Sequence, residues 1–435
     1  MISSKTDSEL GRELMTVRGF QWIYGVKDDP YALLLRAEDD DPQVLYRQIR
    51  ERGPLYSSSA KAWVTADPET AAQALADPRL GVPRHCPAAP ADGEGPMPWD
   101  IPSLDDVLPL DDAYMSLGRE DYNRLRRLAG AAVDARSADL YAPASERICR
   151  QALDRLGSEP GPHDLVPAYA RSTATAFTAA LLGLPPTEHD RFAELSAGAA
   201  PLLDATLCPP RLPTARLLIT SLAGISAMAE ELLGSKQKTP GTDLLSDLMT
   251  SGAYQGGPAA EDDVLALVFL IAAIGVDITA NLVSATLAAL LDRPELWARV
   301  GEDPALAEAA VTETMRWAPP VRVQRLVAHQ DTVLGGETVS RGSEVVVLVE
   351  AANHGDGTED LAHFDLDRRP GAASLSLSEG LAPHCVVPLA RLHASTAVAA
   401  AAAYLPDLRP TGEVRYQRLR SPATRALLNL PAGTA

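Results

Sequence analysis

The segment 377–391, LSEGLAPHCVVPLAR, places a thiol next to an imidazole just before an apolar helical pattern. As a thiolate, Cys385 could ligate haem iron or a soft metal ion, and the imidazole of His384 could serve as an axial ligand of iron. Each residue also has a structural interpretation, since cysteine behaves as a small buried apolar side chain. The residues around them must therefore decide which role applies.

Ionisable residues at helical spacing occur twice upstream of this segment. Glu313 and Arg316 in ETMR lie three residues apart, so they share a helix face and the guanidinium can hold the carboxylate bidentately. In GVDITAN, Asp277 has a carboxyl group that could transfer protons. It is followed by Ile278, which has no hydrogen-bonding side chain, and by Thr279, which has one.

The elements that must position these residues are mostly helices. Apolar residues spaced three and four apart predict helices over 125–135, 168–184, 215–233, 265–291, 305–317 and 388–404. The longest begins near three acids at 261–263, and with roughly 30 residues of about 1.5 Å rise it must cross the molecule. Strand patterns near 63–65 and within 321–349, the latter with a Gly335-Gly336 turn, predict a small β-rich region. The predicted class is mainly α.

Composition limits the partners. Of the 435 residues, 46% are hydrophobic and 22% are charged, which is typical of a folded globular protein. The net charge of −19 repels phosphate backbones and anionic membrane surfaces, so we expect neither nucleic acid nor membrane as a partner. Four cysteines without a CxxC pair indicate no disulfide framework and no metal site. The N-terminus lacks a secretory pattern, and we expect a cytoplasmic protein.

The motifs follow one another in a definite order: ETMR, the Gly-Gly hairpin, HFDLDR at 363–368, then PLARLHA at 388–394. This order resembles that of the cytochrome P-450 superfamily over nearly the whole chain. The resemblance implies a single cytochrome P-450-like domain over residues 1–435, with an N-terminal extension of about residues 1–25. It also implies that Arg368 joins Glu313 and Arg316 in one structural ion network.

In that family the haem-binding loop has the form FGxGxHxCxGxPLAR, and its cysteine ligates the iron. Counted back from Pro388 without a gap, only Gly380 matches the pattern in this chain. The other positions hold Leu377, Ser378, Ala382, His384 and Val386. Glycine lets the backbone approach a flat macrocycle, whereas Val386 and Val387 are stiff. We therefore expect no haem. We expect these valines and Leu377 to fill or flank the vacated space, or the neighbouring helices to close over it.

The resemblance also places Asp277 where the family has its proton-delivering acid, and Ile278 where a threonine usually follows, with Thr279 one position later. Isoleucine cannot donate a hydrogen bond to bound oxygen. The alternative is an active haem-thiolate monooxygenase that hydroxylates a polyketide, with Cys385 as iron ligand after a one-residue slip of the loop. A third interpretation, a haem-free hydrolase or isomerase, lacks a supporting GxSxG, HExxH or P-loop motif.

A haem-free chain of this kind resembles the auxiliary proteins that activate glycosyltransferases in actinobacterial macrolide and anthracycline biosynthesis. The sequence of residues 28–55, DDPYALLLRAEDDDPQVLYRQIRERGPL, is similar to the N-terminal sequence typical of that group. The resemblance implies a non-catalytic protein that binds and activates or stabilises a glycosyltransferase, which attaches a deoxysugar to a polyketide aglycone. The two proteins would form a hetero-oligomer, and this chain would need no catalytic residue and no cofactor.

Overall fold

The computed structural model describes most of the chain. The described residues are 5–36, 42–81, 104–108, 119–133, 135–250, 260–355, 359–368, 374–378, 385–416, 422–424 and 426–434.

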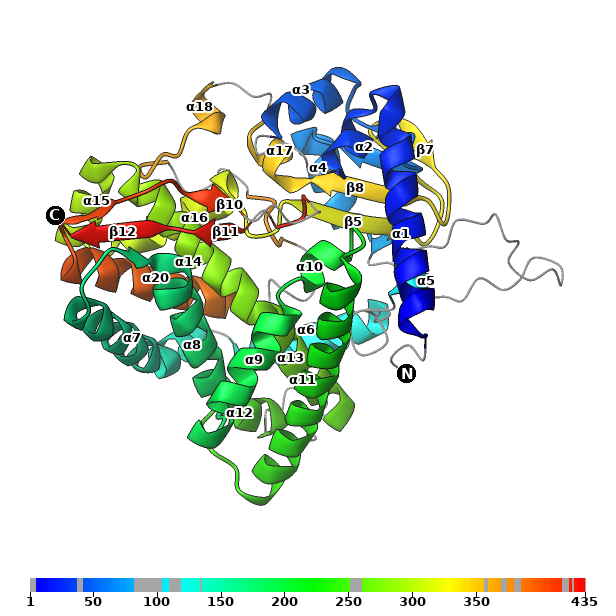
Figure 1. The fold of residues 1–435 in the computed structure, drawn as a ribbon. Coiled ribbons are helices and arrows are strands. Elements are labelled where there is room, and N and C mark those ends of the chain that lie inside the picture. The colour runs from blue at the N-terminus through cyan, green and yellow to red at the C-terminus, as the bar shows by residue number, and fades with distance from the viewer. Residues whose placement is uncertain are drawn as a thin grey trace.

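Helices dominate this structure, and the predicted mainly α class is confirmed (Figure 1). In chain order they are α1 (Asp7–Tyr24), η1 (Gly25–Lys27), α2 (Pro30–Leu34), α3 (Gln43–Glu51), α4 (Pro68–Ala76), α5 (Leu104–Val107), α6 (Arg119–Ala132), α7 (Ala135–Ser158), η3 (Val166–Arg171), α8 (Ser172–Leu182), η4 (Pro186–Glu188), α9 (His189–Ala199), α10 (Leu202–Ala205), α11 (Leu212–Lys238), α12 (Leu244–Thr250), α13 (Glu261–Leu270), η5 (Ile271–Gly275), α14 (Val276–Leu291), α15 (Pro294–Glu302), α16 (Leu306–Trp317), α17 (Val349–Asn353), α18 (Glu359–Ala362) and α20 (Val387–Tyr404).

The strands form small sheets. The largest has the order β1-β2-β8-β5-β3, in which only β2 and β8 are parallel. A three-stranded sheet has the order β4-β12-β9, and two pairs are β6-β7 and β10-β11. The strands are β1 (Tyr56–Ser57), β2 (Ala62–Thr65), β3 (Leu80–Gly81), β4 (His163–Asp164), β5 (Val323–Ala328), β6 (Thr332–Leu334), β7 (Glu337–Val339), β8 (Glu344–Leu348), β9 (Leu408–Pro410), β10 (Arg415–Tyr416), β11 (Leu427–Asn429) and β12 (Pro431–Thr434).

The predicted hairpin within 321–349 is present as β6 and β7. Gly335 and Gly336 join the strands with φ of +57° and +88°, a turn in which both central residues need the left-handed region that glycine adopts without strain. The prediction that strands occur only near 63–65 and within 321–349 is wrong. The structure adds β1, β3, β4 and the C-terminal strands β9 to β12, which are only two to four residues long and therefore carry little alternation.

One continuous helical stretch, Glu261–Leu291, forms the centre of the molecule. It consists of α13, the π-helical turn η5 and α14, and acids in its first turn meet the positive end of the helix dipole. Its length and composition would suit a membrane span, as would those of α11, but its most apolar part is 94% buried inside the protein. A helix that is apolar on all sides is a core helix when other elements surround it.

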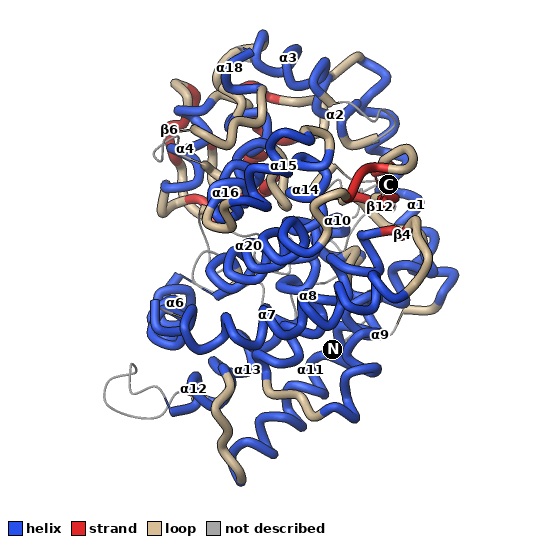
Figure 2. Tube along the Cα trace, turned by 90° about the vertical axis from the view of Figure 1, so that its left-hand side faces the viewer, coloured by secondary structure: helices blue, strands red, loops and turns tan. Residues whose placement is uncertain are grey.

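The surrounding elements are the helices that carry the motifs. α14 contacts α20, α16, α8 and the π-helical segment η3, while α20 also packs against α7 and α15. The two views agree on this arrangement, with α20 beside α7 and α14 in the helical body (Figures 1 and 2). The ETMR motif on α16 and the PLAR motif on α20 are thus held against the same central helix.

Residues 7–24 of the predicted N-terminal extension form α1. Thr6 and Glu9 cap its first turn reciprocally, and Leu10, Leu14 and Val17 are buried. α1 contacts α2, α5 and α11. This part of the extension therefore packs on the body of the protein.

Candidate functional site

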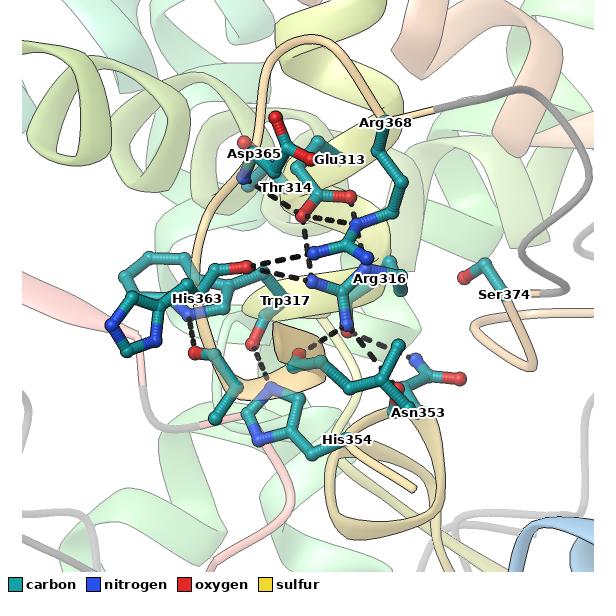
Figure 3. Close-up of polar contacts among 12 residues, drawn as sticks. Glu313, Thr314, Arg316, Trp317, Asn353, His354, His363, Asp365, Arg368 and Ser374 are labelled. Atoms are coloured by element: carbon teal, nitrogen blue, oxygen red, sulfur yellow. Dashed lines mark hydrogen bonds and ion pairs between the residues drawn. The ribbon is translucent and has the colours of Figure 1, made fainter. Parts of the chain in front are cut away.

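The Glu313 carboxylate is the centre of a buried polar network on α16. Arg316 donates from Nε to Oε2 at 2.9 Å and from Nη2 to Oε1 at 2.6 Å, while Arg368 donates to Oε1 at 3.2 Å. The backbone N–H of Asp365 donates to the same Oε1 at 3.1 Å. Glu313 and Arg316 are both at least 95% buried. The structure thus brings together the three residues that the resemblance assigned to one ion network (Figure 3).

Arg316 extends the network to other segments through carbonyl groups. It donates to the carbonyl oxygens of Asn353 at 3.2 Å, Leu361 at 2.7 Å and His363 at 3.0 Å. Asn353 donates in return to the Arg316 carbonyl at 3.1 Å and accepts from the Leu375 N–H at 2.8 Å. The arginine therefore joins α16 to α17 and to the chain around 361–375. Because Nε, Nη1 and Nη2 of Arg316 all donate in these contacts, we assign the network to structure.

The degenerate haem loop is described only in part. Gly380, Ala382 and His384 lie outside the described residues. Leu377 is half-buried against the main core and has φ of +50°, a conformation that strains a leucine. Ser378 is exposed and donates to the Leu375 carbonyl at 3.1 Å. Neither side chain reproduces the aromatic or glycine residue of the family pattern.

Cys385 lies at the start of the last long helix and is 1% exposed. Burial raises the pKa of its thiol to about 12. Only the thiolate ligates a metal well, and burial keeps the proton on sulfur. Across the described residues, no group of three or more His, Cys, Asp or Glu side chains could hold a metal ion. The Cys385 environment is that of a core residue.

Val386 tests whether haem would fit. A porphyrin held by Cys385 and facing residues 277–279 would have to lie between the start of α20 and the central helix. A methyl group added at Gly275 would instead lie 3.9 Å from Cγ1 of Val386, in ordinary contact. A macrocycle that contacts α20 with one face and the central helix with the other needs these two elements to be separated by about 7 Å, which is twice a carbon contact distance. Val386 is 3% exposed and belongs to the main core, so these residues do not fit haem.

Asp277 forms an ion pair that the sequence did not reveal. Arg171, the last residue of η3, donates to Oδ1 of Asp277 at 2.5 Å, and Asn281 donates to Oδ2 at 3.4 Å. Burial raises the pKa of Asp277, although the guanidinium acts in the opposite direction. Ile278 and Thr279 are buried on the same helix. Asp277 is therefore engaged with Arg171 and Asn281.

Known proteins share sequence similarity with this chain over its whole length. No protein-family model matches the chain. The chain is 43% identical to Protein AknT of Streptomyces galilaeus, over all of this chain and 97% of AknT. It is 32% identical to Protein DesVIII of Streptomyces venezuelae, over all of this chain and 96% of DesVIII. It is 29% identical to the cytochrome P-450 family protein EryCII of Saccharopolyspora erythraea, over 97% of each.

Solved structures agree on the fold. The chain superposes with a TM-score of 0.77 on P450BioI, crystallised with an acyl carrier protein bearing hexadec-9Z-enoic acid, over 91% of this chain and 99% of that one at 24% identity. It superposes equally well, with a TM-score of 0.77, on ligand-free CYP164A2 of Mycobacterium smegmatis, over 93% of this chain and 99% of that one at 26% identity.

Proposed function

We propose, from the premise that the chain belongs to the cytochrome P-450 superfamily, that it is a non-catalytic auxiliary protein which binds and activates a glycosyltransferase. The transferase would attach a deoxysugar to a polyketide aglycone in antibiotic biosynthesis. The sequence similarity of the N-terminal segment and the full-length similarity to AknT and DesVIII support this assignment. The chain supplies a binding surface and no catalytic group.

The position of Val386 carries the proposal. A Cβ atom built at Gly275 would lie 3.9 Å from Cγ1 of Val386, and Val386 belongs to the apolar core. This packing leaves too little room for the macrocycle of the superfamily and so supports a haem-free protein. The protonated Cys385 thiol and the ion pair of Asp277 support the same conclusion, because each residue serves the fold where an oxygenase would need it for chemistry. The structural ion network of Glu313, Arg316 and Arg368 is retained.

Activation without catalysis follows from linkage. A protein that binds only the competent conformation of a transferase shifts the transferase toward that conformation. The bound auxiliary protein also stabilises the transferase against unfolding. This stabilisation is about 2.7 kcal/mol when the concentration of free auxiliary protein is 100 times the dissociation constant of the complex. The auxiliary protein therefore raises both the amount of folded transferase and its activity, without touching the reacting atoms.

Co-expression tests the proposal. A candidate partner glycosyltransferase is produced alone, with the wild-type chain, and with a variant carrying Glu308→Gln, an exposed substitution that serves as the matched control. We expect soluble, active transferase only in the two co-expressions, and co-purification of both proteins. A transferase that is equally soluble and active alone would refute the proposal.

Absorption spectroscopy tests the monooxygenase alternative separately. The chain is produced with ample haem precursor, purified, reduced and exposed to carbon monoxide. We expect no Soret band and no thiolate-type shift, since Val386 occupies the space of the macrocycle. A stoichiometric Soret band with that shift would favour the monooxygenase.

A further inference from the structure

Exposed apolar side chains follow the outer face of α1 and the turn η1 after it. Met15, Trp22, Ile23 and Val26 are all exposed, and Met15 and Val26 keep 76% and 74% of their surface in solvent. α1 lies along the outside of the molecule, and its buried side chains face the body (Figure 1). Large apolar side chains that gather on one helix face mark an interaction surface.

The spacing of these residues is that of a helix–helix seam. Arg12, Met15, Gly19, Trp22 and Val26 follow one another at intervals of three, four, three and four residues. Such alternation keeps side chains on one face and is the pattern by which one helix packs along another. We call these five residues the α1 seam. All five are exposed, so no described part of the chain covers the seam.

Gly19 lies at the middle of the α1 seam. A Cβ atom built there meets nothing within 4 Å, so packing inside this chain does not require a glycine at this position. Glycine is unfavourable in the interior of a helix. It allows another backbone to approach closely, because it has no side chain. The middle of the seam is therefore suited to a close contact with a second helix.

Trp22 is held in place before any partner binds. The Arg36 guanidinium lies 4.7 Å from the centre of the Trp22 ring, and Nη2 of Arg36 donates to the Trp22 carbonyl at 2.6 Å. A tryptophan in a fixed orientation loses less conformational entropy on binding than a mobile one. Trp22 is therefore the expected anchor of the seam, since tryptophan is enriched among the residues that dominate interfaces.

The α1 seam is its own complement when a second copy lies antiparallel to it. A two-fold axis at Gly19 places Met15 opposite Ile23 of the second copy, because the two residues are equally far from Gly19 in the sequence. It likewise places Trp22 opposite Thr16, beside the space that the glycines leave. Apolar side chains then meet along the middle of the contact.

Charge complementarity supports the antiparallel direction. Arg12 is exposed at one end of the seam, and Asp28 is exposed at the other end, two residues after Val26 and so within about 8 Å of it. In an antiparallel pair Arg12 lies opposite Val26 of the second copy and can reach its Asp28. The two-fold axis forms this ion pair twice, whereas a parallel pair would bring the two Arg12 side chains together.

We propose that two copies of this chain associate through an antiparallel pair of α1 helices centred on Gly19. From Arg12 to Val26 the contact is about 21 Å long and one helix, about 10 Å, wide. This area is well below the roughly 800 Å² per partner of a standard interface, so the dimer is weak and depends on concentration. The proposal does not rest on the proposed auxiliary function, and either can fail without the other.

Sedimentation velocity of the purified chain tests the proposal, at protein concentrations from about 1 μM to about 1 mM. We expect the average mass to rise from the 46.2 kDa of one chain toward twice that value. Gly19→Leu adds a side chain that meets nothing in its own chain but blocks the approach of the second helix. Trp22→Ala removes the anchor. We expect each variant to associate about tenfold or more weakly.

A charge reversal tests the direction of the helices. Arg12→Glu places a negative charge opposite Asp28 of the second copy, and we expect association to weaken about fivefold, because two exposed ion pairs are lost. Arg147→Glu is the matched control. It makes the same change of charge at an exposed position of α7, which lies far from α1 (Figure 1), and should leave association unchanged. Circular dichroism verifies that each variant is folded.

Three results would overturn the proposal. The first is a mass that stays at 46.2 kDa over the whole concentration range. The second is association that neither Gly19→Leu nor Trp22→Ala weakens. The third is loss of co-purification with the transferase in Gly19→Leu while self-association stays unchanged, because the α1 seam would then bind the transferase and not a second copy.

Discussion

The Glu313 network predicts how much stability the protein loses when Glu313 is replaced in Glu313→Gln. The substitution keeps the size of the side chain and removes its charge, so Arg316, which is 3% exposed, keeps its charge without a full counter-ion. Breaking one partner of a buried ion pair costs about 3 to 5 kcal/mol. Arg316 retains three carbonyl acceptors, at Asn353, Leu361 and His363, so the lower value of about 3 kcal/mol applies.

The expected shift in melting temperature follows from chain length. Unfolding entropy of about 2.1 cal/mol/K per residue gives about 0.9 kcal/mol/K for 435 residues. A loss of about 3 kcal/mol therefore lowers the midpoint by about 3 °C. Glu308→Gln on the same helix is the control, since Glu308 is 75% exposed and lies 3.6 Å from Arg391. A surface substitution of this kind changes stability by less than about 0.5 kcal/mol.

Circular dichroism during heating measures both midpoints on the same instrument. A Glu313→Gln midpoint that equals that of Glu308→Gln would show that the network contributes no net stability, and the assignment of Glu313 and Arg316 to the framework would be refuted. Restoring the charge with Glu313→Asp shortens the side chain by one carbon, and we expect a midpoint between those of the wild type and Glu313→Gln.

Two further predictions concern buried titratable groups. Burial lowers the pKa of His393 to about 3, so the unfolded chain binds the proton first and stability falls as pH drops below the ordinary histidine value of about 6.5. Between pH 6.5 and 5.5 this group costs about 1 kcal/mol, and urea unfolding of His393→Asn should lack that share of the pH dependence. Because the thiol pKa of Cys385 is about 12, iodoacetamide at about pH 8 should leave it unmodified in the folded chain and modify it after unfolding. Rapid labelling of native Cys385, detected by mass spectrometry, would contradict its burial.

The sequence predicted local features well. Helical periodicity identified the long helix and the mainly α class, and two adjacent glycines identified the hairpin at 335–336. These features depend on residues that are close in the chain, where periodicity and turn chemistry act. Loss of the glycine pattern before Pro388 also pointed to the altered haem loop, although the structure describes only part of that loop.

Long-range features could not be predicted in the same way. Arg171 and Asp277 pair across 106 positions of sequence, and no local pattern around Arg171 distinguishes it from a solvated charge. The cavity between α14 and the C-terminal strands is lined by residues that lie far apart in the sequence, from Gln43 to Leu427. The strands of the C-terminal region are too short for alternation to be visible, and their pairing is set by packing against distant parts of the chain.

The π-helical turn at 271–275 makes this part of the central helix tolerant of a change in chain length. A turn of this type holds one residue more than an α-helical turn, and η3, which ends at Arg171, is a second such segment packed against α14. Deleting a single residue from 271–275 would convert the turn to α-helical winding and would leave Asp277 on the face that meets Arg171. A deletion in the α-helical part that follows would instead rotate the rest of the helix by about 100°.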